Sequence, residues 1–151
     1  MASTVTAATM TVSISESINL NGKNQGATNT LSIGSINEVT NRIVTIPTSE
    51  VTVCSFGAAV SSGIYVAAGI RYIRLTNKDD SNYVTLNIEG ANSTDFSVRL
   101  DPGASYLIVS STSTGVVDYG DISGATLEDL TGIKATANSA DVDLEAFIAS
   151  A

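Results

Sequence analysis

Apolar and polar residues alternate along most of the chain, and this pattern limits the fold more than any other feature. A period of two residues is that of a β-strand with one face on a core and the other in water. In the first such run, residues 10–20, the apolar residues are Met10, Val12, Ile14, Ile18 and Leu20. Glu16 interrupts the apolar face, and Ser, Thr or Asn fills the positions between. The run predicts a strand near the N-terminus.

Turn residues separate this run from those that follow. The dipeptide Asn21-Gly22 favours a two-residue hairpin turn. The next run, residues 31–47, contains Gly34, which predicts a bulge. A short strand is expected over residues 50–56, and a loop that carries a weak strand over residues 57–69.

The most regular part of the chain is residues 70–109, where four alternating runs are separated by the turn sequences KDDSN, EGANSTD and DPG. We expect consecutive antiparallel strands, as in a meander within a sandwich or barrel. In the first run, alternation puts Ile70 on the same face as Tyr72. The predicted core residues are Ile73, Leu75, Val84, Leu86, Ile88, Phe96, Val98 and Leu100.

The C-terminal third is less regular. Residues 112–125 are expected to be a loop. Thr126 and Asp129 form a capping-box pattern, which predicts a single helical turn that Gly132 ends. Alternation returns in residues 142–150 and predicts a final strand. With roughly eight to ten strands and almost no helix, the sequence predicts an all-β, antiparallel fold.

The length and composition are those of one domain. The 151 residues suffice for a continuous core, so we expect a single β-domain over residues 1–151. Aromatic residues make up only 5% of the chain and Trp is absent, so the core must consist of Val, Ile, Leu and Ala. Residues 1–40 combine Ser and Thr with alternating apolar residues. We expect them to form an extended arm or strand pair that engages a neighbouring subunit through main-chain hydrogen bonds.

The charge of the chain excludes one class of partner. Fifteen acidic and seven basic residues give a net charge of −8, which opposes binding to the phosphate backbone of a nucleic acid. The N-terminal residues show no signal-peptide pattern, and the apolar runs are far shorter than a membrane span. We therefore expect a protein that is made in a cytosol and binds neither nucleic acid nor membrane.

Residue types that carry catalysis are scarce. The sequence contains no His and a single Cys, Cys54. The absence of His removes the commonest general base and the nucleophile pairs that His activates. Cys54 lies in an apolar run without a basic partner, so we interpret it as a small packing residue. We expect no catalytic residue, no cofactor and no enzyme activity.

Two groups of carboxylates offer the oxygen ligands that calcium prefers. Asp79 and Asp80 lie in a turn, where Asp favours local hydrogen bonds. Asp141, Asp143 and Glu145 alternate along the expected solvent face of the last strand. We expect neither group to hold a metal ion.

Three arginines form a candidate surface site. Arg71, Arg74 and Arg99 lie in adjacent predicted strands and suggest a cationic patch. Pairing with nearby Asp or Glu is an alternative, and so is a contact along the sheet with another subunit, where Arg is enriched. We keep the subunit contact as the hypothesis, with a solvated surface as its alternative.

Five stretches spread along the chain consist of strand-turn-strand phrases and cover about half of it: NGKNQGATNTLSIGSINEV, RIVTIPTSEVTVCSFG, RYIRLTNKDDSNYVTLNI, FSVRLDPGASYLIVSS and VDLEAFIAS. They resemble small virion structural proteins of marine tailed bacteriophages, including those that infect cyanobacteria. The resemblance implies a compact β-domain, a single jelly-roll-like sandwich, that is repeated over a capsid or a tail. It carries no catalytic residue to this chain.

The resemblance implies a non-enzymatic capsid decoration or cement protein of the virion. Its partners would be the major capsid protein, other virion proteins and further copies of itself, joined by modest contacts that symmetry repeats. One alternative is a tail, baseplate or fibre component. Another is a carbohydrate-binding β-sandwich on the virion surface, although a sugar site usually needs exposed aromatic residues. The candidate interface residues are Met10, Val12, Ile14, Ile18, Leu20, Arg71, Arg74 and Arg99.

Overall fold

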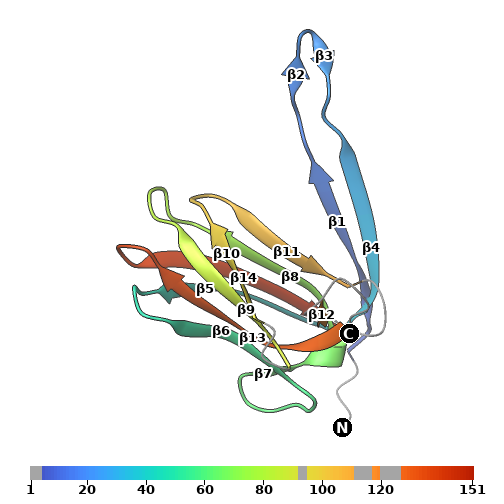
Figure 1. The fold of residues 1–151 in the computed structure, drawn as a ribbon. Helices are drawn as coiled ribbons and strands as arrows, with labels where there is room; N and C mark the ends of the chain where they lie inside the picture. The colour runs from blue at the N-terminus through green and yellow to red at the C-terminus, as the bar shows by residue number, and fades with distance from the viewer. Residues whose placement is uncertain (1–4, 92–94, 111–116, 120–126) are drawn as a thin grey trace.

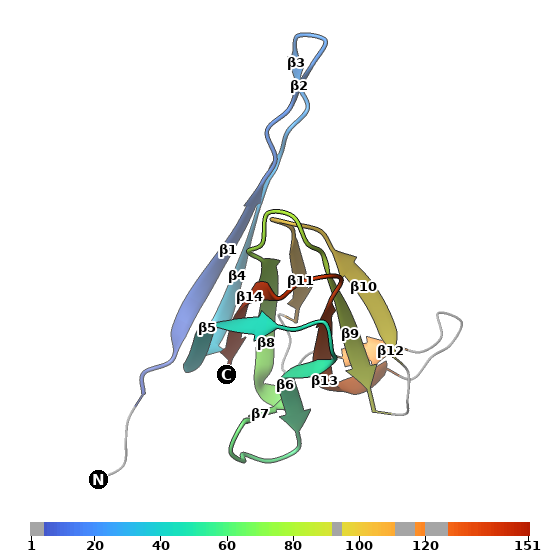
Figure 2. The same cartoon turned by 90° about the vertical axis from the view of Figure 1, so that its left-hand side faces the viewer.

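A computed structural model describes the backbone of residues 5–91, 95–110, 117–119 and 127–151, and the side chains of residues 5–91, 95–110 and 129–151. Within these residues, two sheets pack face to face around one core, and a long hairpin projects from the resulting sandwich (Figure 1, Figure 2). The described helical residues form a single 3-10 turn, η1 (Ala67–Gly69). The expected all-β, antiparallel sandwich with little helix is confirmed.

We name the two sheets of the sandwich after one strand of each. In the β5 sheet, the described strands lie in the order β11 (Ser105–Val109), β8 (Ile70–Asn77), β14 (Val142–Ser150) and β5 (Glu38–Ile46). In the β6 sheet, the order is β10 (Phe96–Leu100), β9 (Val84–Gly90), β13 (Leu127–Ala137), β6 (Val51–Gly57) and β7 (Ile64–Val66). A further strand, β12 (Val117–Tyr119), pairs with β13. The described pairs in both sheets are antiparallel, apart from the parallel pair of β6 and β7.

The chain runs through the sandwich as a nested set of antiparallel strand pairs. β9 pairs with β10, β8 with β11, β6 with β13, and β5 with β14, so the first strand of the sandwich lies beside the last. Eight described strands nested in this way have the strand order of a jelly roll, in which one long ribbon folds over to form both sheets.

The core between the sheets is aliphatic, as the composition predicts. Its fully buried side chains include Ile46, Ile73, Leu75, Val84, Leu86, Ile88, Ile133, Val142 and Leu144. Alternation therefore predicted the inward face of β9 and β14 correctly. One buried polar residue, Asn77, keeps its hydrogen bonds, because its amide donates to the carbonyl oxygens of Asn82 and Leu100 at 2.8 and 3.1 Å.

The meander expected over residues 70–109 is wrong. The four strands β8 to β11 are all described, and of the pairs that follow one another directly in the chain only β9 and β10 are neighbours in a sheet. The KDDSN turn carries the chain from β8 to the β6 sheet, and the DPG turn carries it back to β11, which pairs with β8. Within KDDSN, the Asp79 carboxylate accepts hydrogen bonds from the N–H groups of Ser81 and Asn82 at 2.7 and 2.6 Å. Two strands alternate apolar and polar residues in the same way whether a hairpin joins them within one sheet or an arch joins them across two sheets. The sequence pattern therefore does not distinguish the two connections.

Some predicted side-chain positions in β8 and β10 are also wrong. Tyr72 pairs with Ala149, whereas Ile70, two residues earlier, pairs with the adjacent Ser150, so the strand contains a bulge between them. The bulge points Ile70 into the main core, away from the face that carries Tyr72. In β10, Phe96 stays 41% exposed and Val98 is only half-buried. β10 lies at the end of its sheet, where a side chain has a neighbouring strand on one side only.

Residues 127–132, expected as a helical turn, instead begin β13. This strand lies between β9 and β6 and makes ladders with both, and these contacts outweigh the local preference for one capped turn. Thr126 lies outside the described residues. In the expected loop over residues 112–125, the described residues 117–119 form β12.

The projecting hairpin consists of β1 (Ala8–Ser15) with β4 (Thr28–Ile36), and of β2 (Asn19–Leu20) with β3 (Lys23–Asn24) at the tip. The run expected over residues 31–47 is thus two strands, β4 and β5. The predicted turn at Asn21-Gly22 is confirmed, with φ angles of 50° and 79°. The predicted bulge is also confirmed, because Gly34 and Ser35 together face one residue of β1, and Ser35 takes the positive φ of 62°.

Candidate functional site: a projecting hairpin arm

The hairpin, termed the arm (residues 8–36), is one continuous antiparallel ribbon. Its register is unchanged from Met10 near the base to Leu20 at the tip. Backbone hydrogen bonds donated by Glu16 and Gln25, 2.8 and 2.9 Å long, join the two strand pairs. At 3.3 Å per residue, the distance from Met10 to Leu20 is about 33 Å. The arm therefore reaches well beyond the sandwich, as Figure 1 shows.

The two faces of the arm differ in chemistry. The hydroxyl face carries Thr11, Ser13, Ser15, Thr28, Thr30 and Ser32. Hydroxyl groups meet across the ladder on this face, Ser13 with Thr30 at 3.3 Å and Ser15 with Thr28 at 2.9 Å. The apolar face carries Met10, Val12, Ile14, Ile18 and Leu20, opposite Leu31 and Ile33 near the base.

The base of the arm is fixed to the sandwich by a second apolar cluster. Ile33 and Ile36 are only 1% and 5% exposed, because they pack with Tyr72 and Ala149 on the outer face of the β5 sheet. Further contacts come from Met10, Val12, Leu31 and Phe147. The rings of Tyr72 and Phe147 meet edge to face, with centroids 5.8 Å apart. The arm thus projects from a firmly packed base.

The distal half of the arm lacks such cover. Ile14, Ile18 and Leu20 are 43%, 53% and 58% exposed. The five candidate interface residues on the arm therefore fall into two groups: Met10 and Val12 contribute to the base, whereas these three present aliphatic side chains to solvent. The sequence pattern shows that they share a face but not where the sandwich stops covering it.

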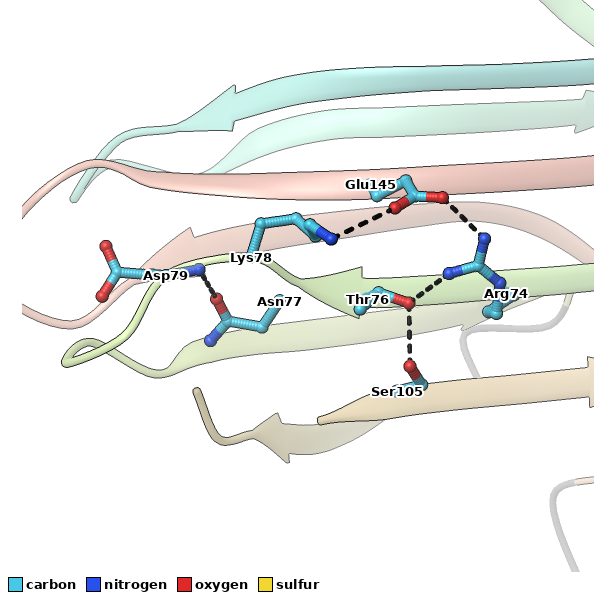
Figure 3. Close-up of polar contacts among 7 residues, drawn as sticks. All are labelled: Arg74, Thr76, Asn77, Lys78, Asp79, Ser105 and Glu145. Carbon is cyan, nitrogen blue, oxygen red and sulfur yellow. Dashed lines mark hydrogen bonds and ion pairs between the residues drawn. The ribbon is translucent and has the colours of Figure 1, made fainter. Parts of the chain in front are cut away.

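A chain of polar contacts crosses the outer face of the β5 sheet (Figure 3). Arg74 donates to the Glu145 carboxylate at 2.6 Å and to the Thr76 hydroxyl at 2.5 Å. Lys78 lies 3.8 Å from the second Glu145 oxygen, and the hydroxyls of Thr76 and Ser105 are 2.8 Å apart. The hydrogen bond from Arg74 holds the pKa of Glu145 below its usual value, and the charges of Arg74 and Lys78 act in the same direction.

The three arginines that were considered as a cationic patch do not share a sheet. Arg71 and Arg74 lie on β8, whereas Arg99 lies on β10 of the other sheet. Arg99 forms an ion pair with Asp101 at 2.7 Å and stacks over the Tyr83 ring at 4.0 Å. Arg71 donates to the backbone carbonyl oxygens of Ala68 in η1 and of Ile70 in β8. Their role in a subunit contact stays a prediction.

Apolar side chains remain exposed on the outer face of the β5 sheet as well. Val39 and Ile43 of β5 are 53% and 63% exposed. With Asn41 between them on the same face, they form what we term the β5 strip. Val39 pairs with Ala149 of the second cluster, so the strip begins where the packing of the arm base ends.

Asp79 and Asp143 have structural partners, and Cys54 is buried. Asp79 is held in its turn by backbone N–H groups, chiefly that of Asn82, which lower its pKa. Asp143 accepts a hydrogen bond from the Thr45 hydroxyl at 3.0 Å. No group of three or more His, Cys, Asp or Glu side chains in the described residues is placed to hold a metal ion. Burial raises the pKa of the Cys54 thiol to about 12, so it stays protonated.

One surface cleft of about 280 Å³ lies along the free edge of β5, where the sequence pattern gave no signal. Glu38, Thr40 and Arg42 line it from β5, and residues 60, 61 and 63–66 line it from the segment that contains β7. Arg42 also donates to the carbonyl oxygen of Val53 on β6, which ties the two sheets together at this edge. Inward-pointing charged residues make an edge strand a poor template for strand addition.

Comparisons with protein-family models, curated protein sequences and solved structures gave no significant match. In the described part of the chain, we found no helix with the length and apolar character needed to cross a membrane.

Proposed function

We propose that the protein is a non-enzymatic structural subunit of a virion, a capsid decoration or cement protein whose arm engages a neighbouring subunit. The observation that carries the proposal is that the base of the arm packs on the sandwich while the apolar side chains of its distal half stay exposed. Ile14, Ile18 and Leu20 form a row of aliphatic side chains that the sandwich leaves uncovered. Such a row marks a contact surface, and a two-stranded hairpin is only marginally stable in water until something packs against it.

The setting on a phage particle rests on the resemblance of the strand-turn-strand phrases to virion structural proteins. The strand order supports it, because jelly rolls are frequent among viral capsid domains, although lectins and cupins use them too. In a cement protein, each single contact can be weak. A modest interface that is repeated by symmetry over a shell adds stability at every joint between shell subunits.

The second candidate function, a tail, baseplate or fibre component, would use the same arm. The two candidates differ in where the protein lies on the particle. Electron microscopy of particles labelled with an antibody against the sandwich separates them, because a decoration protein labels the head and the alternative labels the tail.

The proposal is tested by co-sedimentation with particles assembled from the other virion proteins, without this chain. In a short-arm variant, Asn-Gly replaces residues 13–30. Val12 and Leu31 then flank the turn as Leu20 and Lys23 do in the native tip, so the register and the base cluster are kept. We expect the wild type to sediment with the particles and the short-arm variant to stay in solution, with unchanged circular dichroism of the sandwich.

A matched control changes the other face of the arm. Ser15→Ala with Thr28→Ala removes one pair of hydroxyls and leaves the apolar face intact, so this variant should sediment like the wild type. A short-arm variant that sediments as fully as the wild type would show that the arm is not the attachment element.

A further inference from the structure

The charges of the protein are distributed unevenly between the arm and the sandwich. Residues 1–37 contain one acidic and one basic residue, Glu16 and Lys23. The net charge of −8 therefore belongs to residues 38–151. Two sandwiches that approach each other directly repel, whereas the neutral arm can approach a second sandwich without this cost. The arm is thus suited to connect copies of an acidic domain.

The outer face of the β5 sheet already packs against aliphatic side chains of the kind that the distal arm exposes. At the base, Ile33 and Ile36 pack on Tyr72 and Ala149, and the half-buried Phe147 contacts this cluster. These contacts show that aliphatic side chains from a hairpin pack well on this face. The β5 strip continues the same surface, because Val39 is the ladder partner of Ala149.

The spacing of the β5 strip matches that of the distal arm. Ile14 and Ile18 lie four residues apart on one face of the arm, with Glu16 between them. Val39 and Ile43 are also four residues apart, with Asn41 between them. Four residues of extended chain span about 13 Å in both cases. When two β-ribbons pack face to face with their strands roughly aligned, the two apolar pairs meet and the Asn41 amide can donate to the Glu16 carboxylate.

We propose that the subunit that receives the arm is a second copy of this chain, and that the arm docks on its β5 strip. The inference rests on the proposed function and names the partner of the arm. Because the arm and the strip are different surfaces, the contact closes either by reciprocal exchange between two copies or as a ring.

The test is sedimentation velocity of the purified full chain, from micromolar to roughly millimolar concentration. The arm variant carries Ile14→Ser with Ile18→Ser, and the strip variant carries Val39→Ser with Ile43→Ser. All four side chains are exposed, so both variants should keep the circular dichroism of the wild type. The control is Val60→Ser, which removes an 86% exposed apolar side chain outside both surfaces.

We expect the wild type and the control to self-associate, and each double variant to do so at least tenfold more weakly. A mixture of the arm variant and the strip variant should regain association, because the intact arm of one can dock on the intact strip of the other. If the contact joined two arms instead, the strip variant would associate alone and mixing would not rescue the arm variant. Either of these results overturns the inference.

A wild-type chain that stays monomeric at every concentration also overturns the inference. Co-sedimentation with particles separates this failure from a failure of the proposed function. A monomeric chain whose binding to particles still depends on the arm leaves the proposed function standing and assigns the arm to another virion protein. A chain that stays monomeric and also does not bind particles overturns both.

Discussion

Replacing Ile33 by alanine should loosen the arm and leave the sandwich folded, because the protein has two separate apolar clusters. Ile33 is 1% exposed and belongs to the small cluster at the arm base, whereas Ile133 is fully buried in the main core. Ile→Ala removes three carbon atoms at about 0.8 kcal/mol each, and the cavity adds to this loss. The cost at either position is about 2–4 kcal/mol.

The two substitutions should act on different parts of the molecule. The distal arm depends on its base cluster, since a two-stranded hairpin is marginal by itself. A loss of about 2–4 kcal/mol corresponds to roughly 30- to 700-fold faster hydrogen exchange of amides that open with the arm. Ile33→Ala should therefore accelerate exchange in residues 10–33 and leave β9 and β14 protected.

The matched variant Ile133→Ala should instead lower the free energy of unfolding of the whole sandwich and accelerate exchange in β9 and β14. Hydrogen exchange read out by mass spectrometry of peptides from the arm and from both sheets tests the pair. If Ile33→Ala destabilises the sandwich as much as Ile133→Ala does, or leaves arm exchange unchanged, the reasoning from two clusters is refuted.

Three further results are expected. Leu86→Asp should abolish the folded circular dichroism signal, because it buries an unpaired charge at a fully buried position of β9; a folded variant would contradict the core assignment. Glu145 has a folded pKa below its ordinary value of 4.5, so its pair with Arg74 stabilises the fold above that pH and loses this effect as the pH falls through the folded pKa. Glu145→Gln should therefore flatten the acid limb of a plot of unfolding free energy against pH, and an unchanged limb would contradict this. Cys54 should resist alkylation at neutral pH until urea unfolds the chain, whereas fast labelling of the native protein would contradict its burial.

Local patterns in the sequence predicted features that one segment determines by itself. Asn21-Gly22 takes the positive φ angles that a tight hairpin turn needs. Gly34 marks the bulge in β4, although the neighbouring Ser35 adopts the left-handed conformation. Alternation placed Leu86 correctly, because β9 is covered by the opposite sheet and flanked by a strand on each side.

Local sequence patterns did not predict features that depend on contacts between segments far apart in the chain. Residues 127–132 satisfy a helix-capping pattern locally, yet β9 and β6 bind them as a strand. Phe96 alternates like a core residue, but the end position of β10 leaves it exposed. The strands of Arg74 and Arg99 were expected to be adjacent because they lie near each other in the sequence, yet the topology places them in different sheets.

The candidate site shows the same division. The sequence indicated that Ile14, Ile18 and Leu20 share one face of an N-terminal segment. It did not show that Met10 and Val12 pack at the base while the other three stay exposed, because that division depends on where the arm crosses the outer face of the β5 sheet. The β5 strip was missed as well, since Val39 and Ile43 look like ordinary strand residues until β5 is placed at the edge of its sheet.

The central claim is that the distal apolar face of the arm is covered by a neighbouring subunit in the assembled particle. A cryo-electron microscopy map of particles that contain the protein tests it most directly, at a resolution that separates strands. We predict jelly rolls at the joints of the shell, with the face of Ile14, Ile18 and Leu20 packed against an adjacent subunit. A map in which the arm extends into solvent with this face uncovered would contradict the account.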